Sequence, residues 1–425
     1  MTAGVPQLPH LSIPRWSRPT KQIQAEIKRR WGIKAFILDR LESFSESTSI
    51  ILAELLFPSK CGDLLGTAKW VKAEALFGSG LSEQELSLLS GFLDARSRGP
   101  RFSRLGWIHE ALNWVEREAA LVPDDTICEA QQWNGSSSAF LLQLSSRKGV
   151  TLWLKAVDPT QSYEHRITAA LASIFPDYLP KVISSHQGWG AWLMDNGGAS
   201  AADDGSLADR KAIHRISRCL AELQGASMKH LQKLLDCGCA DWRLEQVRDK
   251  IVPVASRLEE AMAAQDVHGL PRFGRQRLRD ICEATEEACY RLDAIGIPDT
   301  LIHNDLQLDN IIPNKVGCRF IDWDQGGIGN PFMAFEQLRA QLPEDGLPPL
   351  VSGYRSWWAK LLRPEAIDSG FALISPIAIA VQLCSYMMSK PRGATLRSLE
   401  LRHLRSFTRQ LDTALRLVRP TRRSA

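Results

Sequence analysis

The residues most suited to chemistry lie in two neighbouring segments, Leu301–Asn310 (LIHNDLQLDN) and Arg319–Pro331 (RFIDWDQGGIGNP). The first segment has an apolar lead-in, a His-x-Asp sequence and an Asn five positions after Asp305, and the second has a short apolar run that ends at Asp322. Phosphoryl transfer needs little covalent chemistry from a protein and depends on positioning and on neutralising charge. A loop carboxylate such as Asp305 suits this chemistry, because it can orient or deprotonate an incoming hydroxyl.

Two side chains of these segments are candidate metal ligands. The amide oxygen of Asn310 and the carboxylate of Asp322 are hard oxygen ligands of the kind that Mg²⁺ prefers, and Mg²⁺ is usually shared with nucleotide phosphates. Ile311–Ile312 and Phe320–Ile321 are expected to pair as a β-ribbon that holds Asn310 and Asp322 near one another. The alternative is a solvated loop and a strand that happens to end in Asp, but the order, the spacing and the flanking apolar residues favour the site.

The combined pattern, His303-x-Asp305-x₄-Asn310 followed by Ile321–Asp324 (IDWD), resembles the signature of the aminoglycoside phosphotransferase and choline kinase family. This family shares the eukaryotic protein-kinase-like fold. The resemblance covers roughly Thr126–Met388. It implies an α+β, bilobal kinase-like fold in which a small β-rich N-terminal lobe holds ATP against a larger helical C-terminal lobe.

The resemblance implies a role for each residue of this region. Asp305 is the catalytic base or orients the substrate, Asn310 and Asp322 bind Mg²⁺, and His303 is a structural residue that holds the catalytic loop by hydrogen bonds. Many family members carry an Asp after a Gly-x-Pro element, where this chain instead has Glu336. We expect Glu336 to pack behind the catalytic loop in its place.

The resemblance also places a nucleotide site upstream. Lys155 matches the strand lysine that contacts the α- and β-phosphates. Glu164 is the only carboxylate between residues 159 and 176, and is the candidate for the helix glutamate that pairs with Lys155. The hinge whose backbone meets the adenine would include Met194 and Asn196. The alternatives are a solvated strand lysine and an acidic residue that is simply favoured in the first turn of a helix.

The phosphate-covering loop that the resemblance implies would lie between the first two strands of the small lobe. The candidate is Asn134–Ser138 (NGSSS), which contains Gly135, Ser136 and Ser137. It has one Gly where protein kinases have three, but backbone amides and Ser hydroxyls can still bind phosphate oxygens. An ordinary polar turn is the alternative.

The elements that must position these residues follow from hydrophobic periodicity and turn signals. Phe140–Ser145 and Thr151–Val157 flank the turn residues Arg147–Gly149, which predicts a hairpin. Trp189–Met194 predicts a further strand, and Asp195–Gly198 a flexible break. Helices are predicted over Gln161–Ile174, Leu207–Met228, Lys229–Leu235, Trp242–Ala264 and Gln276–Ala294.

The first hundred residues have a different pattern, and the family gives no account of them. Ser82 and Glu85 have capping-box spacing, which predicts a helix from Ser82 to about Ala95. The other predicted elements are a basic helix at Lys21–Trp31, strands at Lys34–Leu41, Ser49–Leu56 and Lys69–Leu76, a linker at Arg96–Arg104 and a helix at Trp107–Glu118.

We therefore expect three parts in this chain. They are a small α+β accessory module at residues 1–104, a kinase-like N-terminal lobe with its lead-in helix at 105–198, and a helical C-terminal lobe with the catalytic and metal loops at 199–425. The accessory module contains no catalytic constellation, and binding of a protein partner is one role that it could have.

Composition excludes several classes of protein. The 425 residues include 52 Lys+Arg and 48 Asp+Glu, and this near balance argues against a strongly basic nucleic-acid-binding protein. The nine cysteines are an odd number in a long chain, which indicates reduced thiols in a cytoplasm. Met1–Pro14 lacks the pattern of a signal peptide. Polar residues interrupt the apolar stretch Phe371–Met388, so we expect a buried helix, no membrane span and a cytoplasmic protein.

The sequence thus predicts an ATP-dependent phosphotransferase, or one that uses another nucleoside triphosphate, with Mg²⁺ as its metal. The acceptor would be a hydroxyl of a small molecule: an aminoglycoside-like compound, a sugar, an amino alcohol or a natural product. One alternative is a catalytically inactive nucleotide-binding regulatory or scaffold protein, and another is a kinase with a protein acceptor. The acceptor stays open, because acceptor pockets of this fold are built from variable helices and loops.

Overall fold

The computed structural model of the chain describes residues 10–14, 19–45, 48–55, 81–83, 85–87, 90, 101–119, 125–136, 138–158, 162–263, 273–315, 317–388 and 398–418. The predicted strand Lys69–Leu76 and the predicted loop residue Ser137 lie outside these residues, as does much of the helix predicted from Ser82. The capping box itself is present: the Ser82 N–H donates to Glu85 Oε2 at 2.7 Å, and the Glu85 N–H donates to Ser82 Oγ at 3.2 Å.

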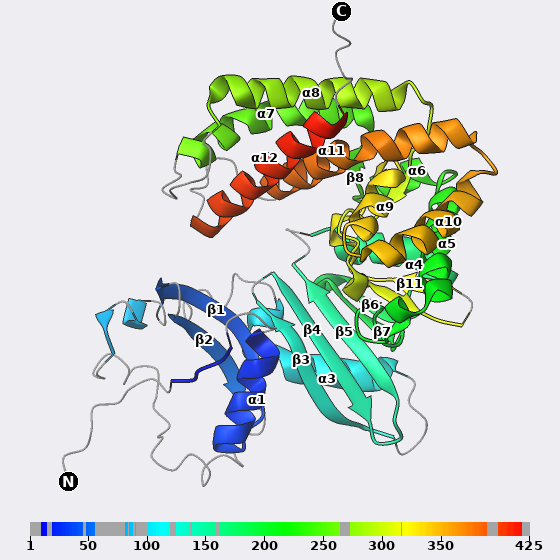
Figure 1. Cartoon of the computed structure of the whole chain (residues 1–425). Coiled ribbons are helices and arrows are strands. Elements are labelled where there is room, and N and C mark those ends of the chain that lie inside the picture. The colour runs from blue at the N-terminus through cyan, green and yellow to red at the C-terminus, as the bar shows by residue number, and fades with distance from the viewer. Residues whose placement is uncertain are drawn as a thin grey trace, which may run out of the picture. The chain divides into compact units, whose positions relative to one another are not determined.

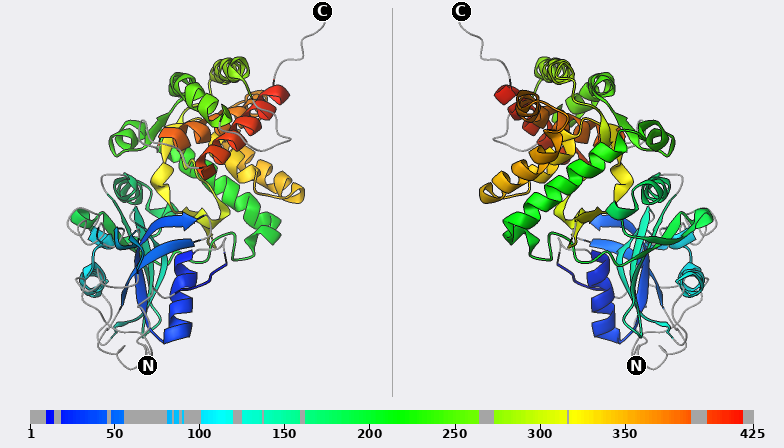
Figure 2. Two further views of the ribbon diagram at one scale, coloured as in Figure 1. Left: turned by 90° about the vertical axis from the view of Figure 1, so that its left-hand side faces the viewer. Right: turned by 90° about the vertical axis from the view of Figure 1, so that its right-hand side faces the viewer.

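The chain divides into two compact units. One consists of Met1–His165 with Lys181–Asn196, and the other of Arg166–Pro180 with Gly197–Ala425. The first unit contains a five-stranded sheet and a separate hairpin, and the second contains most of the helices (Figures 1 and 2). The described residues of the predicted accessory module belong to the same unit as this sheet, and its independence as a domain stays a prediction.

The sheet of the first unit is antiparallel, with the strand order β3-β4-β5-β7-β6. The predicted hairpin is confirmed as β4 and β5, and its turn is closed by a 2.8 Å hydrogen bond from the Ser146 N–H to the Val150 carbonyl. Strand β6 was not predicted, since its sequence (VISSH) shows no apolar alternation. The strands span Ile127–Gly135 (β3), Ala139–Ser146 (β4), Thr151–Val157 (β5), Val182–His186 (β6) and Ala191–Asp195 (β7).

One face of this sheet is buried by helix α3 (Trp107–Glu118). Residues of β4 alternate between partly exposed and buried, as expected of a strand with one covered face. Phe140, Leu142 and Leu144 of β4 join Trp107 of α3 in one hydrophobic cluster, and Trp107 meets Phe140 edge to face at 5.1 Å. Because strand side chains alternate, Leu141, Gln143 and Lys155 point to the opposite face.

The N-terminal elements are helix α1 (Pro19–Trp31) and the antiparallel hairpin β1 (Ala35–Ser45) and β2 (Thr48–Leu55). The predictions of a basic helix and two strands are therefore confirmed, with small shifts at their ends. Apolar residues of α1 and β1 form a small core of their own, which includes Ile23, Ile27 and Ile37. Helix α1 also lies beside β3 (Figure 1).

The second unit is mainly helical. Three predicted helices, now α5, α6 and α8, are confirmed within a few residues of their expected ends, but the helix predicted from Trp242 begins at Leu244, because Trp242 belongs to a strand. The eight cysteines among the described residues are all free thiols. The helices of this unit span Glu164–Ile174 (α4, which starts in the first unit), Arg210–Ser227 (α5), Leu231–Asp236 (α6), Leu244–Ala263 (α7), Arg275–Asp293 (α8), Phe332–Arg339 (α9), Leu347–Trp358 (α10), Pro364–Met388 (α11) and Ser398–Val418 (α12).

Helix α11 is the one described helix that is long and apolar enough to cross a membrane by length and composition. Its most apolar window has a mean hydropathy of 1.8, and 56% of that window is buried inside the protein. It packs against α7, α8, α9 and α12. Such packing is that of a core helix, as the sequence predicted.

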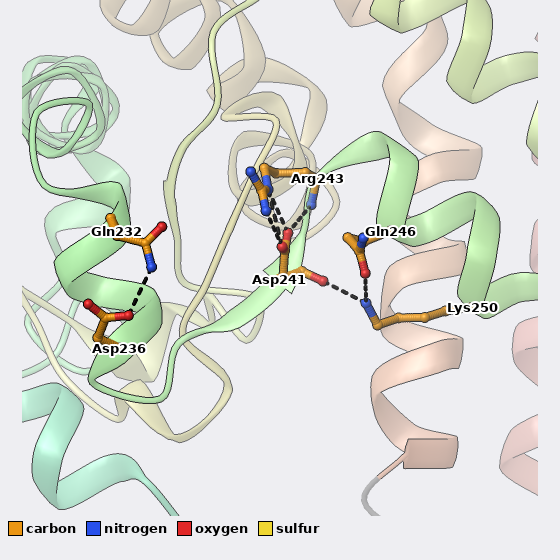
Figure 3. Close-up of polar contacts among 6 residues, drawn as sticks. All are labelled: Gln232, Asp236, Asp241, Arg243, Gln246 and Lys250. Atoms are coloured by element: carbon orange, nitrogen blue, oxygen red, sulfur yellow. Dashed lines mark hydrogen bonds and ion pairs between the residues drawn. The ribbon is translucent and has the colours of Figure 1, made fainter.

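Two small sheets of the second unit interrupt its helices. One has the order β8-β12-β9, formed by Ala240–Trp242, Gly327–Gly329 and Thr300–Ile302, and the other pairs β10 (Ile311–Pro313) with β11 (Cys318–Phe320). At the end of β8, the Arg243 guanidinium binds the Asp241 carboxylate, and the Lys250 ammonium donates to the Asp241 carbonyl at 2.9 Å (Figure 3). These contacts fasten the start of α7 to the strand.

Candidate active site

The predicted catalytic loop begins where β9 ends, at His303. This side chain is only 1% exposed, its Nε2–H donates to the Ile321 carbonyl at 2.8 Å, and its ring lies 4.5 Å from that of Trp323. Burial lowers the pKa of His303, so the imidazole is neutral near neutral pH. The hydrogen bond ties the loop to the segment that carries Asp322, which is the kind of support that the resemblance implies.

The loop turns sharply before Asp305. Asn304 has a positive φ of 58°, which Asn tolerates better than most residues. The Asp305 carbonyl accepts hydrogen bonds from the Gln307 N–H at 2.9 Å and from the Asn310 Nδ2 group at 3.0 Å. Two hydrogen bonds therefore hold the backbone of Asp305, and its side chain is half-buried.

The predicted β-ribbon is confirmed, and it joins the two candidate metal ligands. Ile311 pairs with Phe320 across β10 and β11, and the Ile321 N–H donates to the Asn310 carbonyl at 3.0 Å. Asn310 and Asp322 thus lie at the same end of one ribbon. Asp322 adopts a left-handed conformation, with φ at 69°, so the chain turns at this carboxylate.

The ligand set fits Mg²⁺. Since the Asn310 NH₂ group donates to Asp305, its amide oxygen is the atom that faces away from that bond and can accept a cation. Among the described residues no group of three or more His, Cys, Asp or Glu side chains could hold a metal ion. A site of one amide and one carboxylate agrees with the habit of Mg²⁺, which keeps several water or phosphate ligands.

Two glutamines that sequence reasoning missed support the catalytic loop. Gln337 of α9 accepts from the Leu306 N–H at 2.9 Å and donates to the Asn304 carbonyl at 2.9 Å. Gln341 accepts from the Leu308 N–H at 3.0 Å and donates to the Leu306 carbonyl at 2.7 Å. Each amide therefore binds both a donor and an acceptor of the loop backbone. Only their positions, six and ten residues after Pro331 of the Gly-x-Pro element, could have drawn attention to them.

The carboxylate of Glu336 does not bind this loop among the described residues. Instead, the carboxylate accepts two hydrogen bonds from Arg339, at 2.6 and 2.7 Å. It is only 8% exposed, so it is packed within the protein as expected, but its neighbour Gln337 provides the contacts behind the loop.

In the first unit, Lys155 and Glu164 form the predicted ion pair. Lys155 Nζ lies 2.5 Å from Glu164 Oε1, and the two side chains are only 13% and 3% exposed. Lys155 Nζ also lies 5.8 Å from the centre of the Trp192 ring. The backbone N–H of Glu164 donates to Ser162 Oγ at 3.1 Å, and so begins α4 with a side-chain cap. Because the pair is buried, Lys155 is not the solvated strand lysine of the alternative interpretation. The contact of Lys155 with phosphates stays a prediction.

The candidate phosphate loop is the turn between β3 and β4. Gly135 pairs with Phe140, and the Ser136 hydroxyl accepts from the backbone N–H groups of Ser138 and Ala139 at 3.3 and 3.2 Å. The turn is therefore organised by its first serine, and Ser137 is not among the described residues. The predicted phosphate contacts stay a prediction.

The predicted hinge follows β7. Met194 lies in β7, where its sulfur accepts from Trp192 Nε1 at 3.1 Å. Asn196 Oδ1 accepts from Trp153 Nε1 at 3.2 Å, so the exposed Asn196 side chain is tied to the central strand β5. Trp153 and Lys155 are two positions apart in one strand and hence share a face. The hinge residues and the lysine are thereby placed on connected parts of the same sheet.

Each unit thus contains one group of candidate residues. The second unit has the loop of Asp305 and the ribbon that carries Asn310 and Asp322, and the first unit has the Lys155–Glu164 pair on its antiparallel sheet. The sequence profile of the phosphotransferase enzyme family (APH) matches residues 134–365, which is more than half of the chain. The chain belongs to this family. Its described elements combine a five-stranded antiparallel sheet in the first unit with most of the helices in the second, which agrees with the α+β class that the sequence predicted.

Solved structures with similar folds include a choline/ethanolamine kinase family protein from Mesorhizobium loti (14% identity, 73% of this chain and 99% of that chain covered, TM-score 0.48). Another is an ethanolamine kinase from Plasmodium vivax (13% identity, 79% of this chain and 94% of that chain covered, TM-score 0.48). A third is a macrolide 2'-phosphotransferase from Brachybacterium faecium (13% identity, 74% of this chain and 99% of that chain covered, TM-score 0.43). No curated protein sequence matches the chain significantly.

Proposed function

We propose that the protein transfers the γ-phosphoryl group of ATP, or of another nucleoside triphosphate, to a hydroxyl of a small molecule. The observation that carries the proposal is the hydrogen-bonded connection of Asp305, Asn310 and Asp322. The Asn310 amide donates to the Asp305 carbonyl, and the Asn310 carbonyl accepts from the residue before Asp322. A candidate base and two candidate metal ligands are thus joined by hydrogen bonds in a chain of the phosphotransferase family.

Each residue has one task in this reaction. The acceptor oxygen forms a bond to the γ-phosphorus while the bond from that phosphorus to the bridging oxygen breaks, and the nucleoside diphosphate leaves with the electron pair. The Asp305 carboxylate orients the hydroxyl and takes its proton. Asn310 and Asp322 hold Mg²⁺, which supplies charge neutralisation at the phosphates when it is bound.

The sheet of the first unit supplies the nucleotide contacts in this proposal. Lys155 binds the α- and β-phosphates, and Glu164 holds its ammonium group in place. The backbone around Gly135 and Ser136 covers the phosphates, and the segment of Met194 and Asn196 meets the base. The acceptor is an aminoglycoside-like compound, a sugar, an amino alcohol or a natural product, and the enzyme acts in the cytoplasm.

A label-transfer experiment tests the proposal. The protein is incubated with γ-³²P-ATP, Mg²⁺ and a pooled panel of aminoglycosides, sugars, amino alcohols and a metabolite extract, and an Asp305→Ala protein serves as the blank. We expect label on a small molecule with the wild-type protein and none with the variant. Nucleotide binding without transfer to any small molecule would instead favour the regulatory alternative, and label on protein would favour a protein acceptor.

A further inference from the structure

Strand β3 carries a glutamine that the proposed mechanism does not use. Gln132 is 0% exposed, and its side-chain amide forms two hydrogen bonds with the backbone of Ile37, 95 residues earlier in the chain. Gln132 Oε1 accepts from the Ile37 N–H at 2.8 Å, and Gln132 Nε2 donates to the Ile37 carbonyl at 2.7 Å. One fully desolvated amide thus satisfies both polar groups of one residue of β1.

A second amide completes the connection from the side of helix α1. Gln24 Oε1 accepts from the backbone N–H of Gln132 at 2.9 Å, and Gln24 Nε2 donates to the Ala35 carbonyl at 2.7 Å. Strand β1 pairs with β2, whereas β3 pairs with β4, and no strand pairing joins β1 to β3 among the described residues. Hydrogen bonds from side-chain amides therefore join these two strands, in place of the backbone hydrogen bonds that join strands within a sheet.

This connection lies against the start of the candidate phosphate loop. A Cβ atom placed on Gly135 would be 2.2 Å from Gln132 Nε2 and 2.6 Å from the Ile37 carbonyl oxygen, so only a glycine fits there. The pairing of β3 with β4 shifts between Gln132 and Asn134, which marks a β-bulge at Trp133. The bulge brings the Gln132 side chain and the Gly135 backbone to the same place.

The N-terminal segment is anchored on both sides of this contact. Phe36 belongs to the core cluster of the sheet, together with Phe140, whereas Ile37 belongs to the separate core of α1 and the hairpin. Lys21 of α1 places its ammonium group 4.3 Å from the centre of the Trp133 ring. Movement of β1 relative to β3 would therefore disturb apolar packing as well as the amide bonds.

We propose that Gln132 is a positioning residue for the phosphate loop, through which residues 19–38 hold the loop in its nucleotide-binding conformation. Backbone amides bind phosphates well only when they are already oriented, since ordering a mobile loop on binding lowers affinity. The N-terminal residues then have a function within the enzyme itself. The inference rests on the proposed function for its nucleotide, but not for the structural role of Gln132.

The test compares three variants of the full chain. Gln132→Leu removes both bonds to Ile37. Gln131→Leu makes the same chemical change one residue earlier, on the opposite face of β3. Leu144→Ala creates a cavity in the core beneath the same sheet. It therefore controls for a general loss of stability, because Leu144 does not belong to the loop. Hydrogen–deuterium exchange of residues 133–139 is measured without nucleotide, and the dissociation constant of Mg²⁺-ATP is measured by titration.

We expect Gln132→Leu to speed exchange in residues 133–139 and to weaken Mg²⁺-ATP binding, each by about tenfold. The two control variants should leave both quantities within about twofold of the wild type. Unchanged exchange in Gln132→Leu would overturn the inference, and so would an equal effect of Leu144→Ala. Faster exchange with unchanged ATP affinity would overturn the link to the nucleotide. If the wild-type protein bound no nucleotide, the proposed function would fail, while the exchange data would still decide the role of Gln132.

Discussion

The predicted catalytic loop and the strand that leads to the candidate phosphate loop are held by different kinds of contact. The loop from His303 to Asn310 is held by contacts within about forty residues of sequence, from the ribbon that ends at Asp322 and from Gln337 and Gln341. The strand that leads to Gly135 is instead held by residues 95 and 108 positions earlier in the chain. The conformation of the loop therefore depends on nearby sequence, whereas that of the strand depends on distant sequence.

The two regions also differ in how they hold charge. The first unit keeps a buried ion pair, in which the Lys155 ammonium contacts the Glu164 carboxylate directly. The loop of the second unit is braced by neutral amides: Gln337 and Asn310 bind its backbone, and Gln307 Nε2 donates to the Asp305 carboxylate at 3.3 Å. Removing one partner of a buried ion pair leaves an uncompensated charge, whereas removing an amide leaves only unsatisfied dipoles. The four predictions below use this difference.

The largest effect is expected at the metal ribbon. Asp322→Asn keeps a residue that tolerates the left-handed conformation but removes the charge, so phosphoryl transfer should fall by about 10²–10³-fold with little change in melting temperature. The measurement is the steady-state transfer rate beside a thermal melt. Asp309→Asn, at an exposed position of the same loop, is the matched control and should keep its activity. If Asp322→Asn kept most of its activity, the assignment of Asp322 as a metal ligand would be wrong.

The ion pair of the first unit should respond in the opposite way, with a large loss of stability. Lys155→Met leaves the Glu164 carboxylate in a buried position without its ammonium partner, and the free energy of unfolding should fall by about 3–5 kcal/mol. The double variant Lys155→Met, Glu164→Gln should recover most of this loss, because no charge is then buried. Denaturant titrations measure both values. A double variant as unstable as the single one would show that the pair is not the source of the loss.

Gln337 and Gln132 offer the sharpest comparison of the two regions. Gln337→Leu leaves the buried Leu306 N–H and Asn304 carbonyl without their partner and should lower kcat by about tenfold to a hundredfold through misplacement of the loop. The affinity for Mg²⁺-ATP should not change. Gln132→Leu should show the reverse: a weaker affinity for Mg²⁺-ATP and an unchanged kcat. Gln341→Leu, whose contacts are less buried, should have a smaller effect of the same kind on kcat. Equal effects of Gln337→Leu on both quantities would erase the distinction.

The smallest effect is a pH dependence specific to the second unit. Burial raises the pKa of Asp299, directly before β9, from 3.8 to about 6. The folded state therefore binds the proton more tightly than the unfolded chain, and stability is lost as the pH rises through about 6. The guanidinium of Arg243 opposes this rise but is itself bound to Asp241 (Figure 3).

Asp299→Asn should consequently raise the melting temperature at about pH 8 more than at about pH 4.5, since the variant carries no buried charge at high pH. Melts across this range measure the difference. The exposed Asp345→Asn is the control, and it should shift the two melting temperatures equally. A stabilisation by Asp299→Asn that is the same at both ends of the range would contradict the raised pKa.

Much of the fold could be predicted because its elements carry strong local patterns. The hairpin of β4 and β5, the ribbon of β10 and β11, and helices α5 and α8 follow from alternation or helical spacing over several residues. The strands that were missed or misplaced are short. They include β6 at the edge of the five-stranded sheet and β8 in a small sheet, where Trp242 pairs with Gly329 rather than starting a helix. Pairing with distant strands overrides the local preference there.

The sequence by itself determined the chemistry-bearing residues of the loop and ribbon, because Asp305, Asn310 and Asp322 owe their proximity to a turn and a short hairpin that are encoded locally. Only the tertiary structure showed what holds them. The support of the loop by Gln337 of α9 and Gln341 just after it, and of the phosphate turn by Gln132 and Ile37, depends on side-chain amides whose partners are backbone groups. Any residue can offer such backbone groups, so the sequence carries no sign of where the partner lies.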